Sequence, residues 1–278
     1  MAKKLVLTKE ELENIITLYN EGTSLRKLEN IVGYSRKTLS KILKENNVAI
    51  KDNRINSRKY NLNEEYFKNI NTKEKAYWLG FIAADGYITS PAKHNTQKFG
   101  ITLSIIDKEH LENFNNCLKS TYPVAELKGS ESNYSSNSKF CRLLITSQKS
   151  VNYLKRLGII ENKTNRLTFP TIDQVPEKFI YDYIRGYMDG DGSISFSNNS
   201  CIIGFTGRKE FLTKIQEKLG INLKLCTKDN ITFQLNIGGN YQCKKILDLL
   251  YKGSKKNTRL DRKYKKYLKL KNMLKSRV

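Results

Sequence analysis

Near the N-terminus, apolar residues recur at helical spacing in three short segments between residues 8 and 46. Each segment follows a hydroxyl side chain that can accept a hydrogen bond from the first turn of a helix. These capping residues are Thr8, Ser24 and Ser35. Glycines separate the segments, and glycine readily takes the left-handed conformation that ends a helix. The pattern predicts an all-α domain of three short helices over residues 1–50.

A capped, basic third helix that follows a glycine-containing turn is typical of a helix-turn-helix unit. The segment over residues 8–48 resembles the DNA-binding domain of resolvases and invertases. The resemblance implies that the start of the third helix enters the major groove of DNA. The candidate DNA-binding residues there are Ser35, Arg36, Lys37, Thr38 and Lys41. A small helical bundle that only packs against protein is the alternative interpretation.

Residues 51–72 contain no long apolar period and include several basic residues. We interpret this segment as a basic linker. Linkers of this kind can lie along the backbone of a DNA duplex.

From residue 73 onward the chain repeats itself. The segment KAYWLGFIAADGYI (75–88) has a counterpart in YDYIRGYMDGDGSI (181–194), displaced by 106 residues. Each segment is followed by alternating strand patterns and amphipathic helix patterns in the same order: two strands, a helix, two strands and a helix. A period this long indicates two related halves that share one interface, not a solenoid. We place the halves at residues 73–176 and 177–278.

The repeated segments predict two helices that pack very closely. Gly80 and Ala84 are four residues apart in the first copy, and Gly186 and Gly190 are four apart in the second. Small residues at this spacing remove the ridge from one helix face, so that two backbones can approach each other. We therefore expect the two helices, one from each half, to pack against each other.

Each of these helices ends at an Asp-Gly pair, with Asp85 in the first copy and Asp191 in the second. A helix C-terminus carries partial negative charge, so two carboxylates held together there are unfavourable unless a cation joins them. Oxygen ligands without His or Cys suit Mg²⁺, which takes its remaining ligands from water and phosphate. The pattern predicts a Mg²⁺ site suited to cutting phosphodiester bonds.

The charge of the chain favours a polyanionic partner. The 278 residues include 50 Lys and Arg and 27 Asp and Glu, for a formal net charge of +23. Residues 251–278 alone contain twelve basic residues and one acidic residue, Asp261. Nucleic acid and an anionic membrane surface are the partners that such a charge suits. The sequence has no apolar run of the length of a membrane span.

Two further features bear on the compartment and on metal binding. The N-terminus lacks the apolar stretch of a signal peptide, so we expect a cytoplasmic protein, or one in an organelle or phage-infected host, and not a secreted one. The five cysteines are scattered and only two histidines are present, which argues against a structural zinc site.

The segments WLGFIAADG (78–86) and IRGYMDGDG (184–192) resemble the two motifs of the LAGLIDADG homing endonuclease family in its single-chain, double-motif form. The resemblance covers roughly residues 73–270. It implies an α/β (α+β) fold, in which a pseudo-two-fold pair of αββαββα halves forms a DNA-binding saddle, here with the helix-turn-helix domain added. The eighth motif position holds the catalytic, metal-binding acid of the family, and it maps to Asp85 and Asp191. The first copy has Ala83 at the sixth position where the second has Asp189.

The family also places a basic residue near each scissile phosphate. The segment LGIIENKTNRLTFP (157–170) resembles that part of the family, and Lys163 is its candidate residue. In the second half, aligning NKTNRL with KKNTRL suggests Lys256, whereas the LDRKY segment favours Lys263. We adopt Lys263 and keep Lys256 open.

Alternating apolar and polar residues predict strands whose polar faces can contact base edges in the major groove. In the strand predicted over residues 231–237, Ile231 and every second residue after it are expected to lie in the core. Amide side chains on the other face suit adenine. The candidate base-contacting residues are Lys98, Thr102, Arg142, Thr232, Gln234 and Asn236.

The function that these features predict is a site-specific, Mg²⁺-dependent DNA endonuclease that makes a staggered double-strand cut, as in intron homing. A chain that carries both motifs is expected to act as a monomer on double-stranded DNA, without a membrane. One alternative is a transcription regulator built on a non-cleaving scaffold. Another is an intron RNA maturase, against which the helix-turn-helix argues because side chains cannot read the deep groove of an RNA helix.

Overall fold

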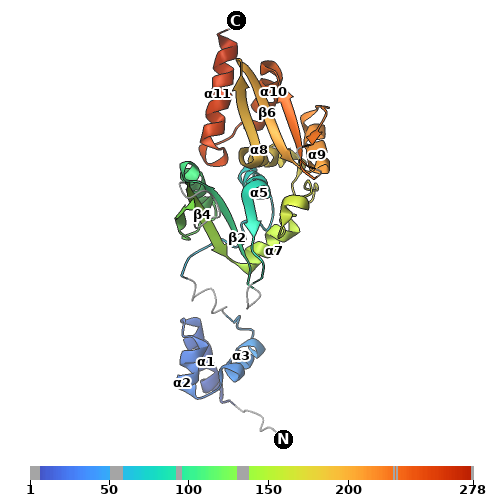
Figure 1. Ribbon diagram of the computed structural model, residues 1–278. Helices are drawn as coiled ribbons and strands as arrows, with labels where there is room; N and C mark the ends of the chain where they lie inside the picture. Colours follow the sequence, from blue (N-terminus) through green and yellow to red (C-terminus); the bar gives the residue numbers. More distant parts are fainter. Residues whose placement is uncertain are drawn as a thin grey trace. The chain divides into compact units, whose positions relative to one another are not determined.

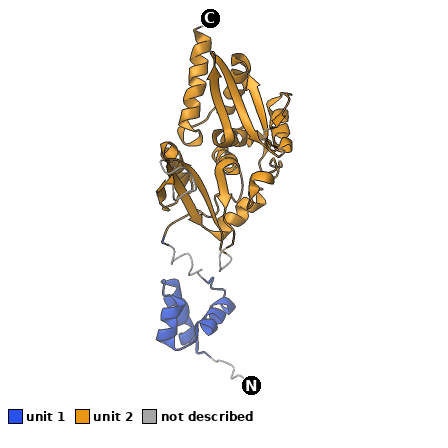
Figure 2. Cartoon of the chain, viewed as in Figure 1, with its two compact units in different colours: residues 1–59 blue, residues 60–278 orange. Residues whose placement is uncertain are grey.

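The chain folds into two compact units, residues 1–59 and 60–278 (Figure 2). Their structure is a computed structural model. The residues that it describes are 7–50, 59–91, 96–129, 138–227, 229 and 231–276.

The first unit consists of three helices with a small apolar core. They are α1 (Lys9–Asn20), α2 (Leu25–Val32) and α3 (Arg36–Glu45) (Figure 1). Thr8 forms a capping box with Glu11, and Ser24 and Ser35 cap the next two helices, as the sequence predicts. Gly33 ends α2 at a φ of 74°, in the left-handed region. The core that these helices enclose contains Ile15, Tyr19, Leu28, Leu39 and Leu43.

The linker that we predicted over residues 51–72 is too long. Its first part, residues 51–58, lies outside the described residues. The second part belongs to the second unit, because Tyr66, Phe67 and Ile70 are buried in that unit's core. The segment lacks a periodic pattern since its aromatic side chains are buried from irregular turns and not from one face of a helix or strand.

The second unit contains the predicted repeat of two αββαββα halves, and its order of helices and strands is confirmed. The first half consists of α5 (Lys73–Asp85), β1 (Gly86–Ile88), β2 (Lys98–Ser104), α6 (Lys108–Cys117), β3 (Val124–Lys128), β4 (Lys139–Thr146) and α7 (Gln148–Arg156). The second half consists of α8 (Ile180–Asp191), β5 (Gly192–Ser197), β6 (Ser200–Gly207), α9 (Lys209–Leu219), β7 (Cys226–Thr227), β8 (Phe233–Gly238), α10 (Asn240–Tyr251) and α11 (Asp261–Lys275).

Each half contains one four-stranded antiparallel sheet, in the orders β1-β2-β4-β3 and β5-β6-β8-β7. The identical orders give the two halves the same topology. Figure 1 shows α5 and α8 side by side between the two sheets. The mixed fold with two sheets and a central helix pair is the one that the sequence predicts.

The backbones of α5 and α8 touch at two glycines. A Cβ atom at Gly80 would lie 2.0 Å from the carbonyl oxygen of Tyr183, and one at Gly186 would lie 2.0 Å from that of Tyr77. No other residue fits at these points without moving a helix backbone. This close approach brings the C-terminal ends of both helices to one place.

Much of the strongly basic segment over residues 251–278 forms a helix, α11. Tyr267, Leu270 and Leu274 are buried, at the spacing of one helix face. The helix contacts the edge strand β5, where the Lys266 Nζ donates a hydrogen bond of 2.7 Å to the carbonyl of Ile194. The lysines that make this segment basic flank an apolar stripe, and a count of charges alone does not indicate such a stripe.

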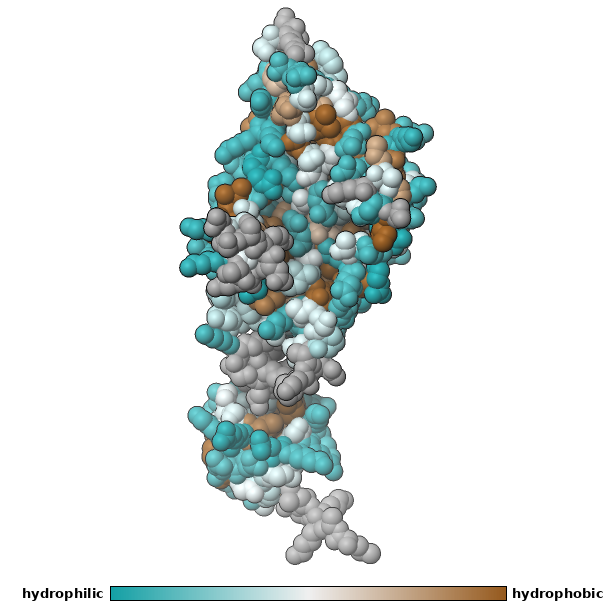
Figure 3. Space-filling model, in the orientation of Figure 1, coloured by the Kyte–Doolittle hydropathy of each residue, from teal (hydrophilic) through white to brown (hydrophobic). Residues whose placement is uncertain are grey.

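Hydrophilic residues cover most of the face shown in Figure 3, and apolar residues form small separate patches. None of the described helices is long and apolar enough to cross a membrane.

Candidate functional site

The paired ends of α5 and α8 bring together the two predicted acidic residues. Asp85 is the last residue of α5, and Asp191 is the last residue of α8. A Cβ atom at Gly190 would lie 2.4 Å from the Cβ of Ala84 and 3.2 Å from the Oδ2 of Asp85. The small residue before Asp191 therefore allows the carboxylate of the opposite helix to lie beside it. The two halves thus contribute one carboxylate each to a common site.

Burial and mutual repulsion both act on these carboxylates. Burial and the nearby Asp191 raise the pKa of Asp85 to about 6, against the opposing effect of Lys263. Burial also raises the pKa of Asp191, while Lys163 and Lys263 lower it. Asp191 is the more exposed of the two residues. A site of this kind favours a cation between the two acids.

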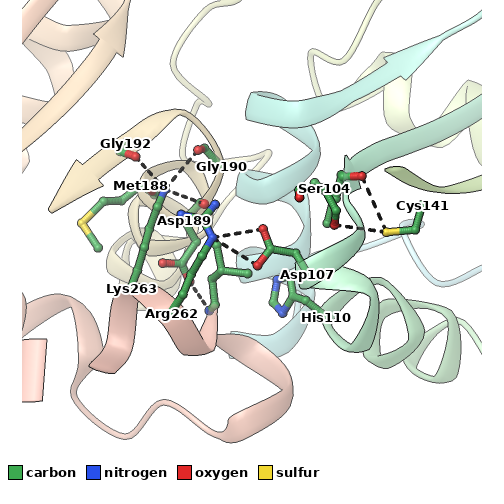
Figure 4. A network of polar contacts seen from close by, with 12 residues as sticks. Ser104, Asp107, His110, Cys141, Met188, Asp189, Gly190, Gly192, Arg262 and Lys263 are labelled. Carbon is green, nitrogen blue, oxygen red and sulfur yellow. Dashed lines mark hydrogen bonds and ion pairs between the residues drawn. The ribbon is translucent and has the colours of Figure 1, made fainter. Parts of the chain in front are cut away.

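The predicted Lys163 and Lys263 lie at the ends of the same two helices. The Nζ of Lys163 donates a hydrogen bond to the carbonyl of Ala84, near the end of α5. The Nζ of Lys263 donates to the carbonyls of Met188 at 2.7 Å, Asp189 at 2.7 Å, Gly190 at 3.1 Å and Gly192 at 2.6 Å (Figure 4). Both lysines therefore bind the exposed carbonyls of a helix C-terminus, where positive charge is favourable.

Burial lowers the pKa of both ammonium groups, that of Lys263 to about 8. Nearby carboxylates, including Asp85 and Asp191, counteract this effect. The charges of the lysines and of the two acids therefore stabilise each other.

Lys256, the alternative for the second lysine, lies elsewhere. Its Nζ is 2.7 Å from the Oε1 of Glu109, and its side chain is 67% exposed. The alignment that suggested it does match two buried leucines, Leu167 and Leu260. Lys163 lies before its leucine, whereas Lys263 lies after its own, on the first turn of α11. The alignment therefore matches the two segments around Leu167 and Leu260, but the lysine that reaches the end of α8 is Lys263 and not the aligned Lys256.

Each lysine-bearing segment also forms a contact with the other half. Arg262, next to Lys263, forms two hydrogen bonds of 3.1 and 3.0 Å with Asp107, just before α6 of the first half (Figure 4). Conversely, the Nη1 of Arg208 in the second half donates a bond of 2.7 Å to the carbonyl of Asn165, near Lys163. Each half thus helps to position the lysine of the other.

Sequence reasoning missed the role of Asp189. Its buried carboxylate accepts hydrogen bonds from the hydroxyls of Tyr77 at 2.8 Å and Tyr251 at 3.0 Å, and from the backbone N–H of Leu260 at 2.7 Å. The difference between Asp189 and Ala83 at the sixth motif position was the available signal. It indicates that only the second motif needs an acceptor there.

A cavity of about 190 Å³ opens beside Asp191. Lys163, Asp191, Arg208 and Thr232 are among the residues that line it. Of the candidate base-contacting residues, Thr232 thus lies next to the acidic site. Within the described part of the chain, no group of three or more His, Cys, Asp or Glu residues could hold a metal ion. The acidic donors at the site are therefore the two carboxylates.

The other base-contacting candidates lie on the partly exposed faces of the sheets. Thr102 and Arg142 are direct partners in the β2–β4 register, and Lys98 pairs with Thr146. Gln234 and Asn236 lie on β8, with their apolar neighbours Leu235 and Ile237 buried. Ile231 contradicts the predicted alternation because it lies in the turn before β8 and is 51% exposed.

In the first unit, four of the candidate DNA-binding residues also make local contacts, and one of them is Lys41, whose Nζ is 3.8 Å from the Oε1 of Glu45. The Oγ of Ser35 accepts from the N–H of Thr38 as the helix cap. The Nε of Arg36 is 3.0 Å from the Oε2 of Glu29. Lys37 and Lys41 are exposed.

A family model described as a LAGLIDADG-like domain matches residues 72–158, so the resemblance seen in WLGFIAADG is confirmed for the first half. The LAGLIDADG meganuclease I-CpaMI, bound to uncleaved DNA, has a TM-score of 0.45 and 14% identity over 73% of this chain and 92% of its own. The I-LtrWI homing endonuclease, bound to target DNA, has a TM-score of 0.48 and 12% identity over 77% of this chain and 92% of its own. The LAGLIDADG homing endonuclease I-GzeII, in complex with a DNA target, has a TM-score of 0.48 and 15% identity over 73% of this chain and 91% of its own. No curated protein matches the sequence.

Proposed function

Because residues 72–158 form a LAGLIDADG-like domain and α8 repeats its motif, we propose that this protein is a site-specific DNA endonuclease. It cuts both strands of a duplex with a stagger, as enzymes of intron homing do. The observation that carries the proposal is the meeting of Asp85 and Asp191 at the ends of α5 and α8, beside one lysine from each half.

The donor chemistry of the site fits Mg²⁺. Asp85 and Asp191 offer carboxylate oxygens, and their raised pKa values reflect a penalty that a bound cation would relieve. We assign both as its ligands. When bound, Mg²⁺ supplies activation of water and neutralisation of charge on the phosphate.

Lys163 and Lys263 are suited to act on the phosphates themselves. Their ammonium groups lie at the ends of the motif helices, among the acids that hold the metal. Charge that develops on the oxygens of a phosphate during cutting is stabilised by cations already in position. We assign one lysine to each scissile phosphate.

The outer faces of the two sheets are the proposed reading surfaces for DNA. Arg142 beside Thr102 suits guanine, and Gln234 and Asn236 suit adenine. The net charge of +23 supplies phosphate contacts that do not depend on sequence. The exposed start of α3 in the first unit adds a second contact with the major groove. One chain supplies both halves of the site, so we propose a monomer.

Incubation of the full-length protein with random-sequence duplexes tests this function. With Mg²⁺, sequencing of the cut ends should recover one recurrent site with staggered breaks. The variant Asp85→Asn should yield none. Recovery of bound but uncut duplexes would instead indicate a transcription regulator on a non-cleaving scaffold. Selective binding of structured RNA under the same conditions would indicate a maturase.

A further inference from the structure

The two lysine-bearing segments are held by different chemistry. The segment that leads into α11 is held by a buried polar chain. His110 contacts the hydroxyl of Tyr77 at 2.9 Å, Tyr77 donates to Asp189, and Asp189 accepts the N–H of Leu260, three residues before Lys263. Because Tyr77 gives its one hydroxyl proton to Asp189, the His110 Nε2 is the donor to the Tyr77 oxygen.

The equivalent positions around Lys163 are apolar. Tyr183 is the counterpart of Tyr77, but its neighbouring motif helix has Ala83 in place of Asp189 and so offers it no carboxylate. The counterpart of His110 on the first turn of α9 is Phe211. Phe169, six residues after Lys163, packs against Phe211 and Tyr183 at ring-centre distances of 5.5 and 5.9 Å. Aromatic packing therefore takes the place of the polar chain here, and the hydrogen bond of the Arg208 Nη1 to the carbonyl of Asn165 is the contact that the other half adds.

The difference extends to the ammonium groups. Lys263 donates to four backbone carbonyls, whereas Lys163 donates to that of Ala84. A set of directional bonds fixes the position of an ammonium group more narrowly than a single bond does. The polar chain fixes the start of α11 from the other side, through Leu260.

We propose that Tyr77 and Asp189 are positioning residues for Lys263, and that they make the two cutting centres unequal. Tyr77 belongs to the motif helix of the first half, so it controls the lysine that the second half supplies. Loss of this hydrogen-bonded chain of side chains should slow the cutting of one DNA strand and leave the cutting rate of the other strand nearly unchanged. The inference rests on the proposed endonuclease function.

Strand-resolved cutting tests it with a matched pair of variants. Tyr77→Phe removes the hydroxyl that binds Asp189, and Tyr183→Phe removes the hydroxyl at the equivalent place. The substrate is a duplex recovered from the random library and labelled on either strand, with saturating protein and Mg²⁺. Tyr77→Phe should slow one strand about fivefold, as expected for one hydrogen bond, and the other less than twofold. Tyr183→Phe should change neither strand by twofold.

Asp189→Asn is a third variant and should slow the same strand about tenfold. Equal slowing of both strands by Tyr77→Phe, or slowing of neither, would overturn the inference. A protein that only loses stability would show equal slowing, so the ratio of the strand rates separates positioning from folding.

Amine labelling tests the same inference without cutting. In the full-length protein, acetic anhydride followed by mass spectrometry measures the exposure of each lysine. Tyr77→Phe should raise the labelling of Lys263 at least threefold relative to Lys163, and Tyr183→Phe should not. If the wild-type protein cuts neither strand, the proposed function fails. Unchanged labelling of Lys263 in Tyr77→Phe would then refute the positioning role by itself.

Discussion

The substitution Asp85→Asn should stabilise the metal-free protein while it abolishes cutting. Burial and the neighbouring Asp191 raise the pKa of Asp85 from an ordinary value of 3.8 to about 6. The folded state therefore binds a proton at this carboxyl more tightly than the unfolded state does. As the pH rises through this window, the folded protein loses stability, because the charged form is the one that burial and repulsion penalise. Asparagine removes the charge without changing the shape.

The size of the effect follows from the two pKa values. A difference of about two in pKa corresponds to about 3 kcal/mol at neutral pH. Partial exposure of Asp85 screens part of this energy, so we expect a gain of about 1–3 kcal/mol. For a unit of this size, each kcal/mol shifts the melting temperature by about 2–4 °C.

Thermal unfolding of the wild type and Asp85→Asn in EDTA, between pH 4 and pH 8, measures this gain. The variant should melt at the higher temperature at pH 7.5, and the two curves should converge near pH 4. Mg²⁺ should stabilise the wild type and leave the variant nearly unchanged. A variant that is no more stable than the wild type at pH 7.5, or a difference independent of pH, would refute the electrostatic reasoning.

Three further comparisons test other parts of the structure. Removal of residues 1–59 should weaken DNA affinity at least tenfold but change the single-turnover rate at saturation less than twofold, and a collapse of that rate would contradict a role in binding. Gly80→Ala should destabilise the second unit by more than about 3 kcal/mol in urea unfolding, because its Cβ would lie 2.0 Å from the carbonyl oxygen of Tyr183. Gly238→Ala is the control, because nothing lies within 4 Å of its Cβ, and a similar loss of stability in both variants would contradict the reasoning. Lys263→Met should slow the cutting of one strand at least a hundredfold and Lys256→Met less than threefold, and the reverse order would assign the site to Lys256.

Local patterns predicted the elements of both units well. The capping residues Thr8, Ser24 and Ser35 begin the helices that they were expected to begin. These features depend on neighbours within a few residues, so the sequence contains all the information that they need. The close packing of α5 on α8 was also predictable, because Gly80 and Gly186 leave room for a partner backbone.

Contacts between individual side chains that are distant in the sequence could not be predicted. The carboxylate of Asp189 binds Tyr77, which is 112 residues away in the chain, and nothing in the local pattern indicates such a partner. The choice between Lys256 and Lys263 depends on how α11 turns back onto the end of α8. The apolar stripe of α11 is present in the sequence, with Tyr267, Leu270 and Leu274 at helical spacing, and a charge count does not reveal it.

The most direct test of the shared acidic site compares binding with cutting in Asp85→Asn and Asp191→Asn. Both variants and the wild type are placed on a strand-labelled target duplex, at concentrations that saturate binding in Ca²⁺. Strand breakage is then followed in a single turnover with Mg²⁺. The wild type should cut both strands, and each variant should bind as tightly yet cut neither. Wild-type cutting by either variant would contradict the assignment of a carboxylate from each half to one metal-dependent site.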